Sequence, residues 1–312
     1  MKKFLIHLHI FYEDMYPKFK EQLLALKLDS YDLYVTLVKE NPELISDIKT
    51  SFPNAHIKVV ENRGYDLAPF VDVLNGVNLD DYQYVVKLHT KRNIKHHKVP
   101  KFLQESRWRE ALTKFISSKD NFDSVVASMD SDASIGMHAD SNVIFSNLCD
   151  HLLEKKSFYN YLKLNNFKVM PYKFVAGTMF IARSSVFKEL QQLKLKISDF
   201  ELPDPTRQSW QLAHAMERLC GYLVTSKHLK IKDFLNHSLI NYRYWSHVVA
   251  FDLKIAKAAF VDVYIPKTLK TLKSVLWDNF FCKYIISVRK TKKNKLLVKI
   301  LRIPVLSIKL KK

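Results

Sequence analysis

The segment 61–70 carries side chains that could bind a phosphate-bearing ligand. It reads E-N-R-G-Y-D-L-A-P-F and directly follows an apolar, strand-like run at 55–60. Open α/β sheets bind their ligands at the carboxyl ends of their strands, so we expect this segment to line such a site. An ordinary strand-to-helix turn, with Gly64 at a positive φ and Asp66 capping a helix that Pro69 begins, would give the same letters. The candidate ligand-binding residues are Asn62, Arg63, Gly64 and Asp66.

A second cluster of cations follows the next apolar segment, 82–88. From Lys87 to Arg109 the chain has 8 Lys or Arg against one acid, Glu105, which gives a local charge of +7. Ammonium and guanidinium groups bind phosphate oxygens through charge-assisted hydrogen bonds. A solvated basic face is the alternative. The candidate ligand-binding residues here are Lys87, His89, Thr90, Lys91, Arg92, Arg107 and Arg109.

The helix predicted at 210–219 holds the candidates for a general base. Its apolar stripe recurs at i, i+4 and i+7, as Leu212, Met216 and Leu219. His214 and Glu217 stand three residues apart on another face, which suits a carboxylate working beside an imidazole. An ion pair of Glu217 with Arg218 is the structural alternative. Glu201 and Asp204 are the reserve candidates for the base.

A β segment predicted at 174–182 contains Gly177 and Thr178 near its middle. A glycine there would let an acceptor molecule approach the backbone closely, although glycine inside a strand also marks a bulge. We therefore include both residues among the candidate substrate-binding positions.

Metal ligands are not expected. Asp130 and Asp132 form an Asp-x-Asp sequence, but they lie between a predicted helix and a short strand, where a polar turn is the better interpretation. His96 and His97 have no Cys or His at a zinc-ligand spacing and are assigned no role. We expect a metal-independent protein, with Mg²⁺ or Mn²⁺ as the alternative.

The elements that must position these residues alternate between strands and helices. Strands separated by helix-length connections predict a mostly parallel α/β sheet. In the first strand, even-numbered residues from Phe4 to Ile10 are apolar, whereas His7 and His9 lie on the other face. The predicted strands are 4–11, 31–38, 55–60, 82–88, 134–138 and 174–182, and the predicted helices are 17–28, 41–51, 107–116 and 210–219, the last closed by Gly221.

Charge separates the chain into two parts. The net charge is +19, of which residues 267–312 carry +13 from 14 Lys or Arg and one acid, Asp278. These cations are interleaved with Trp, Phe, Val and Ile, a composition typical of amphipathic helices on anionic membrane surfaces. Nucleic acid and a solvated helix are the alternatives, although no nucleic-acid-binding motif accompanies the charge, and we expect no nucleic-acid partner. We predict a domain at 1–250 and a helical, membrane-associated tail at 251–312.

Composition places the protein in a reducing compartment. Cys149, Cys220 and Cys282 are odd in number and far apart, which does not suit a disulfide scaffold. The N-terminal apolar run is broken by histidines and is unlike a signal peptide, and no run reaches the ~18 apolar residues of a membrane span. We expect a cytoplasmic protein, peripheral on the inner face of the membrane.

Five motifs in order resemble the rhamnan synthesis F family of bacterial polysaccharide glycosyltransferases. They are N-R-G-Y-D at 62–66, K-L-H-T-K at 87–91, R-W-R at 107–109, A-G-T-M-F at 176–180 and L-A-H-A-M-E-R at 212–218. The resemblance spans about residues 3–245 and excludes the basic tail. Tyr65 stands where members of the family usually have a second basic residue.

The resemblance implies a GT-A-like transferase that adds a sugar, such as rhamnose or another hexose, to a surface-polysaccharide or lipopolysaccharide precursor. Its partners would be a nucleotide-diphosphate sugar and a glycan or lipid-linked acceptor. Because no carboxylate follows the fourth strand, we expect Arg63 and the cations of 87–92 to stabilise the departing diphosphate in place of a metal. Glu217, His214 and Asp66 are the expected catalytic residues. A non-catalytic scaffold of a polysaccharide-assembly complex is the alternative.

Overall fold

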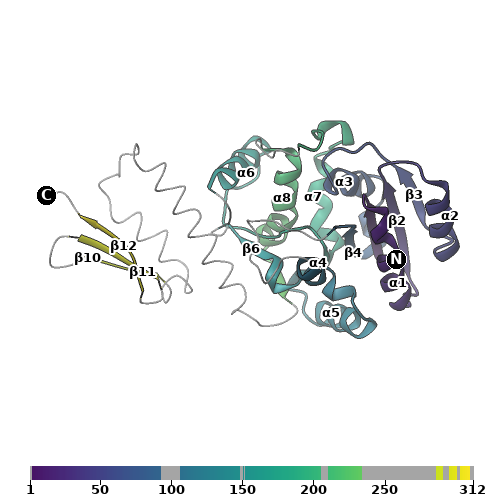
Figure 1. Cartoon of the computed structure of the whole chain (residues 1–312), viewed down its shortest axis with the longest axis horizontal. Coiled ribbons are helices and arrows are strands. Elements are labelled where there is room, and N and C mark those ends of the chain that lie inside the picture. The colour runs from purple at the N-terminus through teal and green to yellow at the C-terminus, as the bar shows by residue number, and fades with distance from the viewer. Residues whose placement is uncertain are drawn as a thin grey trace. The chain divides into compact units, whose positions relative to one another are not determined.

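The computed structural model describes residues 2–92, 106–147, 150, 152–204, 210–233, 286–290, 295–300 and 303–309. The chain divides into two compact units, Met1–Lys254 and Ile255–Lys312 (Figure 1). Among the helices within these ranges, none has the length and apolar content to cross a membrane.

The first unit is built from alternating strands and helices. Its strands are β1 Lys2–Ile10, β2 Tyr31–Leu37, β3 His56–Val59, β4 Tyr82–His89, β5 Ile135–Ala139, β6 Ile144–Ser146, β7 Lys173–Val175, β8 Phe180–Arg183 and β9 Lys230–Asp233. Its helices are α1 Tyr16–Ala25, α2 Pro42–Ser51, α3 Leu67–Asn75, α4 Ser106–Thr113, α5 Lys119–Ser131, α6 Leu152–Leu164, α7 Lys188–Gln192 and α8 Leu212–Ser226.

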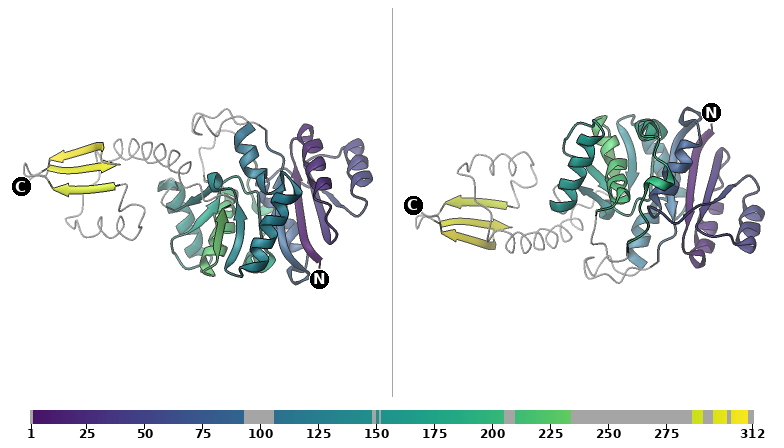
Figure 2. Two further views of the ribbon diagram at one scale, coloured as in Figure 1. Left: turned by 90° about the horizontal axis from the view of Figure 1, so that it is seen from below. Right: turned by 90° about the horizontal axis from the view of Figure 1, so that it is seen from above.

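Seven strands form one central sheet in the order β3-β2-β1-β4-β8-β5-β9. Neighbours from β3 to β4 are parallel, β8 is antiparallel to β4 and to β5, and β9 is parallel to β5. Helices flank this sheet on both sides (Figure 2). The prediction of a mostly parallel α/β sheet is confirmed, and the carboxyl ends of β1 to β4 meet at one edge.

Strand β1 is buried on both faces because a helix covers each of them. On one face the Phe4 ring packs against Phe122 of α5 at 5.2 Å between ring centroids. On the other face the His7 ring stacks on Phe70 of α3 at 5.8 Å. The predicted alternation is therefore correct, and the face that carries His7 and His9 is as enclosed as the apolar one.

The segment predicted as one strand at 174–182 is two strands in different sheets. β7 pairs with β6 in a separate two-stranded sheet, whereas β8 joins the central sheet. Between them, Gly177 has φ +84° and Thr178 has φ +52°, so the chain makes a tight turn instead of a bulge. The prediction of a single strand was wrong because apolar residues lie on both sides of Gly177, and the sequence pattern therefore gives no sign of a turn between them.

Helix α8 extends past Gly221, which was predicted to close it. A Cβ on Gly221 would lie 2.2 Å from the carbonyl oxygen of Lys173, so this glycine allows β7 to cross the helix closely. The helix ends at Ser226 instead. Glycine here serves packing, since no positive φ is required of it.

In the second unit the described residues form a three-stranded antiparallel sheet, β10 Ile286–Lys290, β11 Lys295–Ile300 and β12 Ile303–Lys309. The prediction of a helical tail is wrong for these residues. Their sequence is rich in Val and Ile, which favour strands over helices. The remainder of the predicted tail, 251–285, lies outside the described residues.

Candidate functional site

A buried ion pair joins three distant segments at the carboxyl edge of the sheet. The side chain of Lys87, near the end of β4, has no exposed surface, and its ammonium group donates to the carboxylate Oδ2 of Asp66. It also donates to the carbonyl oxygen and the hydroxyl of Thr178, at 3.1 and 2.9 Å. All three of its hydrogens therefore have protein partners. The prediction that Lys87 contacts a phosphate directly is wrong.

The loop before α3 brings Asp66 to this position. Gly64 has φ +59°, as the turn interpretation predicted, and its N–H donates to the carbonyl oxygen of Glu201 at 3.0 Å. A Cβ on Gly64 would lie 2.4 Å from the ring of Phe200, so only glycine fits there without a shift. The other part of that interpretation is wrong, because the Asp66 side chain makes no capping bond to α3 and binds Lys87 and Thr178 instead.

The electrostatics of the pair follow from its enclosure. Burial alone would raise the pKa of the Asp66 carboxyl, but the charge of the neighbouring groups and the hydrogen bonds from Lys87 and Thr178 hold it well below its usual value. Burial lowers the pKa of His89 to about 3, so its ring is neutral near pH 7. Lys87 is therefore the cation that balances the Asp66 carboxylate at that pH.

His89 faces Asp66 with a lone pair. Its Nε2 lies 2.8 Å from the carbonyl oxygen of Gly177, and because a carbonyl only accepts, Nε2 must carry the proton of the neutral ring. The other nitrogen, Nδ1, is then an acceptor, and it lies 3.8 Å from Oδ1 of Asp66. Two acceptors facing each other form a place where hydrogen-bond donors of a ligand, such as sugar hydroxyl groups, can bind.

The turn at Gly177 connects this cluster to α8. The N–H of Gly177 donates to Oε1 of Glu217 at 2.8 Å. On the same helix, Nδ1 of His214 accepts a hydrogen bond from the N–H of Gln211 at 3.1 Å. The predicted positions 177, 178 and 217 are thus brought together with Asp66, Lys87 and His89, although they are far apart in the sequence.

Arg218, next to Glu217, has a structural role. Its buried guanidinium pairs with Asp150 at 2.6 Å and with Glu154 of α6, and it lies 3.5 Å from Glu217. Burial alone would lower the pKa of Arg218. The charges of these three carboxylates and the hydrogen bond to Asp150 outweigh burial and raise that pKa. The predicted alternative of a structural ion pair is therefore confirmed for Arg218.

The other predicted cations are spread along the edge. Arg63 donates to the carbonyl oxygen of Phe200 at 3.0 Å and retains 28% of its side-chain exposure. Lys91 places its ammonium 5.9 Å from the centre of the Trp108 ring. Arg92 is exposed and pairs with Asp14 at 2.9 Å. These three cations lie near the carboxyl edge, as predicted. They do not point into one common site, because each contacts a different part of the protein.

The remaining predicted residues have mixed positions. The Thr90 hydroxyl is buried and accepts the N–H groups of Phe11 and Tyr12 at 2.9 and 2.8 Å, so it fixes the backbone beyond β1. Asn62 is half-buried. Arg109 of α4 is half-buried beside Met15, and of Arg107 the structure describes only its helical backbone.

The Asp-x-Asp sequence lies at the opposite edge, and the prediction of a polar turn is correct only for Asp132, because Asp130 and Ser131 still belong to helix α5. Asp130, the second-last residue of α5, accepts hydrogen bonds from Tyr84 and from Lys3, at the start of β1. Asp132 accepts from the N–H of Ser134 at 2.9 Å. Across the described residues, no three His, Cys, Asp or Glu side chains gather to hold a metal ion. Metal independence stays a prediction.

Sequence reasoning assigned no role to three polar residues beneath this site. His7, His9 and Thr36 are buried, and the Thr36 hydroxyl lies 2.9 Å from Nε2 of His7 and 3.0 Å from Nδ1 of His9. In the sheet register His7 lies beside Lys87, and His9 beside His89. The signal that could have identified them is a polar face on a central strand, where apolar residues are the rule.

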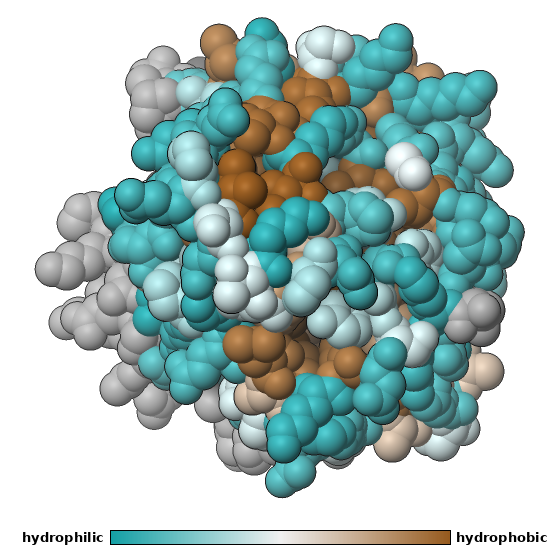
Figure 3. Space-filling model, turned by 90° about the vertical axis from the view of Figure 1, so that its right-hand side faces the viewer, coloured by the Kyte–Doolittle hydropathy of each residue, from teal (hydrophilic) through white to brown (hydrophobic). Residues whose placement is uncertain are grey.

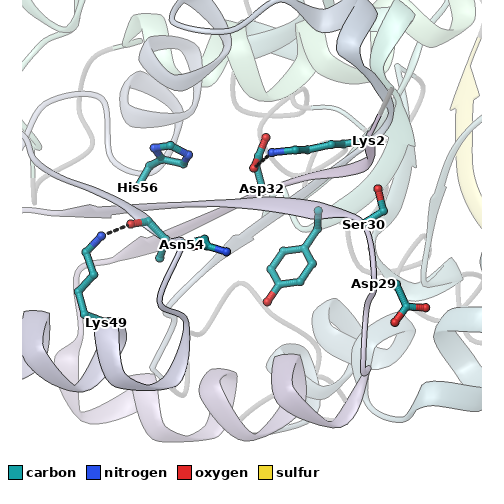
Figure 4. Close-up of a pocket in the computed structure, with 9 residues that line it drawn as sticks. Lys2, Asp29, Ser30, Asp32, Lys49, Asn54 and His56 are labelled. Atoms are coloured by element: carbon teal, nitrogen blue, oxygen red, sulfur yellow. Dashed lines mark hydrogen bonds and ion pairs between the residues drawn. The ribbon is translucent and has the colours of Figure 1, made fainter.

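An open pocket of about 520 Å³ lies elsewhere, at the amino-terminal edge of β1, β2 and β3 (Figure 4). Lys49 at its side donates to the carbonyl oxygen of Ala55, and Lys2 pairs with Asp32, so both lysines of the pocket already have partners within the protein. Beyond β3 the surface of the first unit is mainly hydrophilic, with hydrophobic areas between (Figure 3). None of the residues that line the pocket belongs to the carboxyl edge of the sheet.

Comparison with known proteins identifies a family whose sequence model matches most of this chain. The sequence model of the family described as rhamnan synthesis protein F matches residues 1–229. The uncharacterised protein WxcX of Xanthomonas campestris pv. campestris strain B100 is 26% identical over 228 residues, which are 70% of this chain and 31% of WxcX, and WxcX of strain ATCC 33913 gives the same figures. The chain thus spans less than a third of the length of these relatives. Among solved structures, TarS 1–349 of S. aureus is 10% identical with a TM-score of 0.36, over 70% of this chain and 55% of that one.

Proposed function

Because this chain belongs to the rhamnan synthesis protein F family, we propose that it is a glycosyltransferase of polysaccharide synthesis. The proposed donor is a nucleotide-diphosphate sugar, of rhamnose or another hexose. The proposed acceptor is a glycan or a lipid-linked precursor of a capsule or lipopolysaccharide. The strand order, with an antiparallel strand after four parallel ones, supports a GT-A-like arrangement in which the ligand lies at the carboxyl edge.

The observation that carries this proposal is the enclosed Asp66–Lys87 pair with His89 beside it. Lys87 and Thr178 hold one oxygen of Asp66, and the other oxygen faces Nδ1 of His89. Since the pKa of Asp66 is held low, the carboxylate stays charged. It therefore serves as a hydrogen-bond acceptor and not as a group that takes up and releases a proton. Asp66 and His89 would therefore orient sugar hydroxyl groups.

The chemistry needs a base and cations in addition. In the transfer the acceptor hydroxyl oxygen bonds to the anomeric carbon, the bond from that carbon to the diphosphate breaks, and the diphosphate leaves with the electron pair. Glu217, at the Gly177 turn, with His214 one turn before it on α8, is the proposed base for the acceptor proton. Arg63 and Lys91, which are not fully buried, are the proposed contacts for the negative charge that develops on the diphosphate.

Two proposals concern conditions and location. We propose that turnover needs no divalent metal, because the loop after β4 offers cations where a carboxylate would hold one. We also propose that the basic second unit binds an anionic membrane, on the cytoplasmic side where nucleotide sugars are made, because residues 267–312 carry +13.

A panel of nucleotide sugars tests the function. The full chain is incubated with each donor and a glycan acceptor, with and without EDTA, and release of the nucleoside diphosphate is measured. We expect turnover with at least one donor, unchanged by EDTA, and a loss of at least about 100-fold in Asp66→Asn. If no donor binds or turns over, the glycosyltransferase proposal is wrong, and a non-catalytic scaffold role is the alternative.

A further inference from the structure

Two hydrogen bonds link His7, Thr36 and His9 inside the sheet, and none of these three residues has a role in the proposed reaction. Thr36 of β2 holds one histidine on each side, with its Oγ1 at 2.9 Å from Nε2 of His7 and 3.0 Å from Nδ1 of His9. All three residues are buried, with exposures of 0 to 2%. A buried polar chain in a sheet core costs free energy unless its hydrogen bonds are satisfied.

The hydrogen bonds of this chain fix where the protons lie. Nδ1 of His7 is enclosed and has no partner, and an enclosed N–H without an acceptor is costlier and rarer than an enclosed lone pair. The neutral His7 ring therefore carries its proton on Nε2 and donates it to Thr36. The Thr36 hydroxyl has one hydrogen, which it then donates to Nδ1 of His9. His9 must carry its own proton on Nε2.

The Nε2 of His9 lies at the edge where the ligand is expected. His9 is the second-last residue of β1 and the register neighbour of His89. No described residue pairs with its Nε2, and this nitrogen is not among the fully enclosed atoms that lack a partner. The chain of hydrogen bonds thus ends in a donor that faces the same edge as Asp66 and His89.

We propose that His9 donates its Nε2–H to a diphosphate oxygen of the bound nucleotide, and that Thr36 and His7 are positioning residues that hold His9 in this tautomer. This inference rests on the proposed function for the identity of the ligand. The order of protons, from His7 through Thr36 to His9, rests on the contacts within the protein.

The environment keeps His9 neutral. Burial, opposed by the charge of Asp66 and assisted by that of Lys87, lowers the pKa of His9 to about 4. Lys87, Asp66, His89 and His7 are the charged or titratable groups around it on the neighbouring strands and loop. In the protein without ligand, His9 is therefore a donor without a charge near pH 7.

The proton positions are testable without any ligand. Two-dimensional ¹⁵N–¹H spectra of the histidine rings of the full chain distinguish protonated Nε2 from protonated Nδ1. We expect both His7 and His9 to carry the proton on Nε2. A matched pair of variants tests Thr36: Thr36→Ser keeps the hydroxyl and should keep the His9 tautomer, whereas Thr36→Val keeps the shape and should give a mixture. A His9 ring protonated on Nδ1 in the unsubstituted protein would overturn the proton order.

Binding of nucleoside diphosphates tests the donor role. Calorimetric titration with UDP, dTDP and GDP identifies the nucleotide that binds the unsubstituted chain. We expect His9→Phe to weaken its binding at least about 10-fold and His9→Gln, whose amide can still donate, to stay within about 3-fold. Thr36→Val should weaken binding about 3-fold and Thr36→Ser should restore it. The thermal melting of each variant shows whether it folds.

The outcomes separate the two proposals. If the unsubstituted chain binds a nucleotide and His9→Phe, still folded, binds it equally well, the role of His9 is wrong and the proposed function stands. If the unsubstituted chain binds none of the three nucleotides, the nucleotide donor is wrong and the ligand assigned to His9 falls with it, while the tautomer measurement still decides the proton order.

Discussion

The ammonium of Lys87 has no contact with solvent, and its charge is balanced inside the protein by Asp66. Such pairs add little net stability, because desolvation of two charges offsets their attraction. Removing one partner is different, since it leaves an unbalanced charge in the core. We infer that this pair is present to place a carboxylate oxygen at the edge of the sheet.

Asp66→Asn and Lys87→Met should each lower the free energy of unfolding by about 3 to 5 kcal/mol, because each leaves one buried charge. The double variant should recover most of this loss, since neither charge remains, yet it should stay inactive for lack of the carboxylate. Urea unfolding and donor turnover measure the two effects separately.

A control for this prediction lies on α3, the helix that follows Asp66. Asp72 of α3 pairs with the exposed Lys58, and Asp72→Asn should change stability by less than about 1 kcal/mol. If the double variant is as unstable as the worse of the single ones, the loss does not arise from an unbalanced charge, and the account of the pair would have to be abandoned.

At the scale of elements, α8 and β7 are packed backbone to backbone. The contact depends on Gly221, whose position leaves no room for a Cβ beside the carbonyl of Lys173. β7 leads directly into the turn at Gly177, which holds His89 and Glu217. The distance between α8 and β7 therefore sets the position of two proposed site residues.

Two effects predict opposite changes in the free energy of unfolding for Gly221→Ala. Helix propensity alone predicts a gain of about 1 kcal/mol, whereas the close contact with Lys173 predicts a loss of about 1 to 3 kcal/mol. We expect the loss, together with weaker donor turnover, because the shift reaches the Gly177 turn. Thermal or urea unfolding measures it.

Gly76→Ala is the matched control. A Cβ at Gly76 would lie 3.6 Å from its nearest neighbours, an ordinary contact, at a negative φ. Its stability should stay the same or rise slightly. Equal effects of the two substitutions would contradict the packing argument.

The sequence predicts the elements whose pattern is local. β1 to β4 were found from apolar runs and α2 from Asn41, whose side chain caps that helix as expected. The division into β7 and β8 was not found, because the two strands belong to different sheets and only the positive φ angles at 177 and 178 separate them. A period of two cannot reveal which sheet a strand joins.

The site was predictable in its location but not in its contacts. Strand ends identified the positions of Asp66, Lys87 and His89. That Lys87 is enclosed depends on partners 21 and 91 residues away, and no pattern within either motif shows such a pairing. The sequence pattern does not distinguish a lysine that points at a ligand from one that points at a buried carboxylate.

At the scale of the molecule, the two units differ in charge and permit a direct test of membrane binding. The full chain should float with vesicles that contain phosphatidylserine, and a variant that ends at Lys254 should remain in solution, because residues 267–312 supply +13 and each nearby cation contributes about 1 kcal/mol. Vesicles of phosphatidylcholine alone are the control. Flotation of both forms would assign membrane binding to the first unit.

Buried neutral histidines make the first unit sensitive to acid. Burial lowers the pKa of His9 and His138 to about 4 and that of His89 to about 3, and it lowers the pKa of His7 well below 6.5. The unfolded chain binds these protons first, near pH 6.5, so the stability is fully present above that pH and is lost as the pH falls toward the folded pKa values.

Four such groups should lower the free energy of unfolding by on the order of 5 kcal/mol between pH 7.5 and pH 5.5. Asp66 adds nothing in this range, because its pKa lies below the usual carboxyl value in the folded state and near 3.9 in the unfolded state, so its contribution is lost only below about pH 4. Urea unfolding at a series of pH values gives the slope. His138→Gln, away from the proposed site on β5, should remove about one quarter of the pH dependence and leave nucleotide binding unchanged. A slope of less than one proton would mean that these rings are charged in the folded protein, and the neutral His9 and His89 on which the proposed ligand contacts depend would then be wrong.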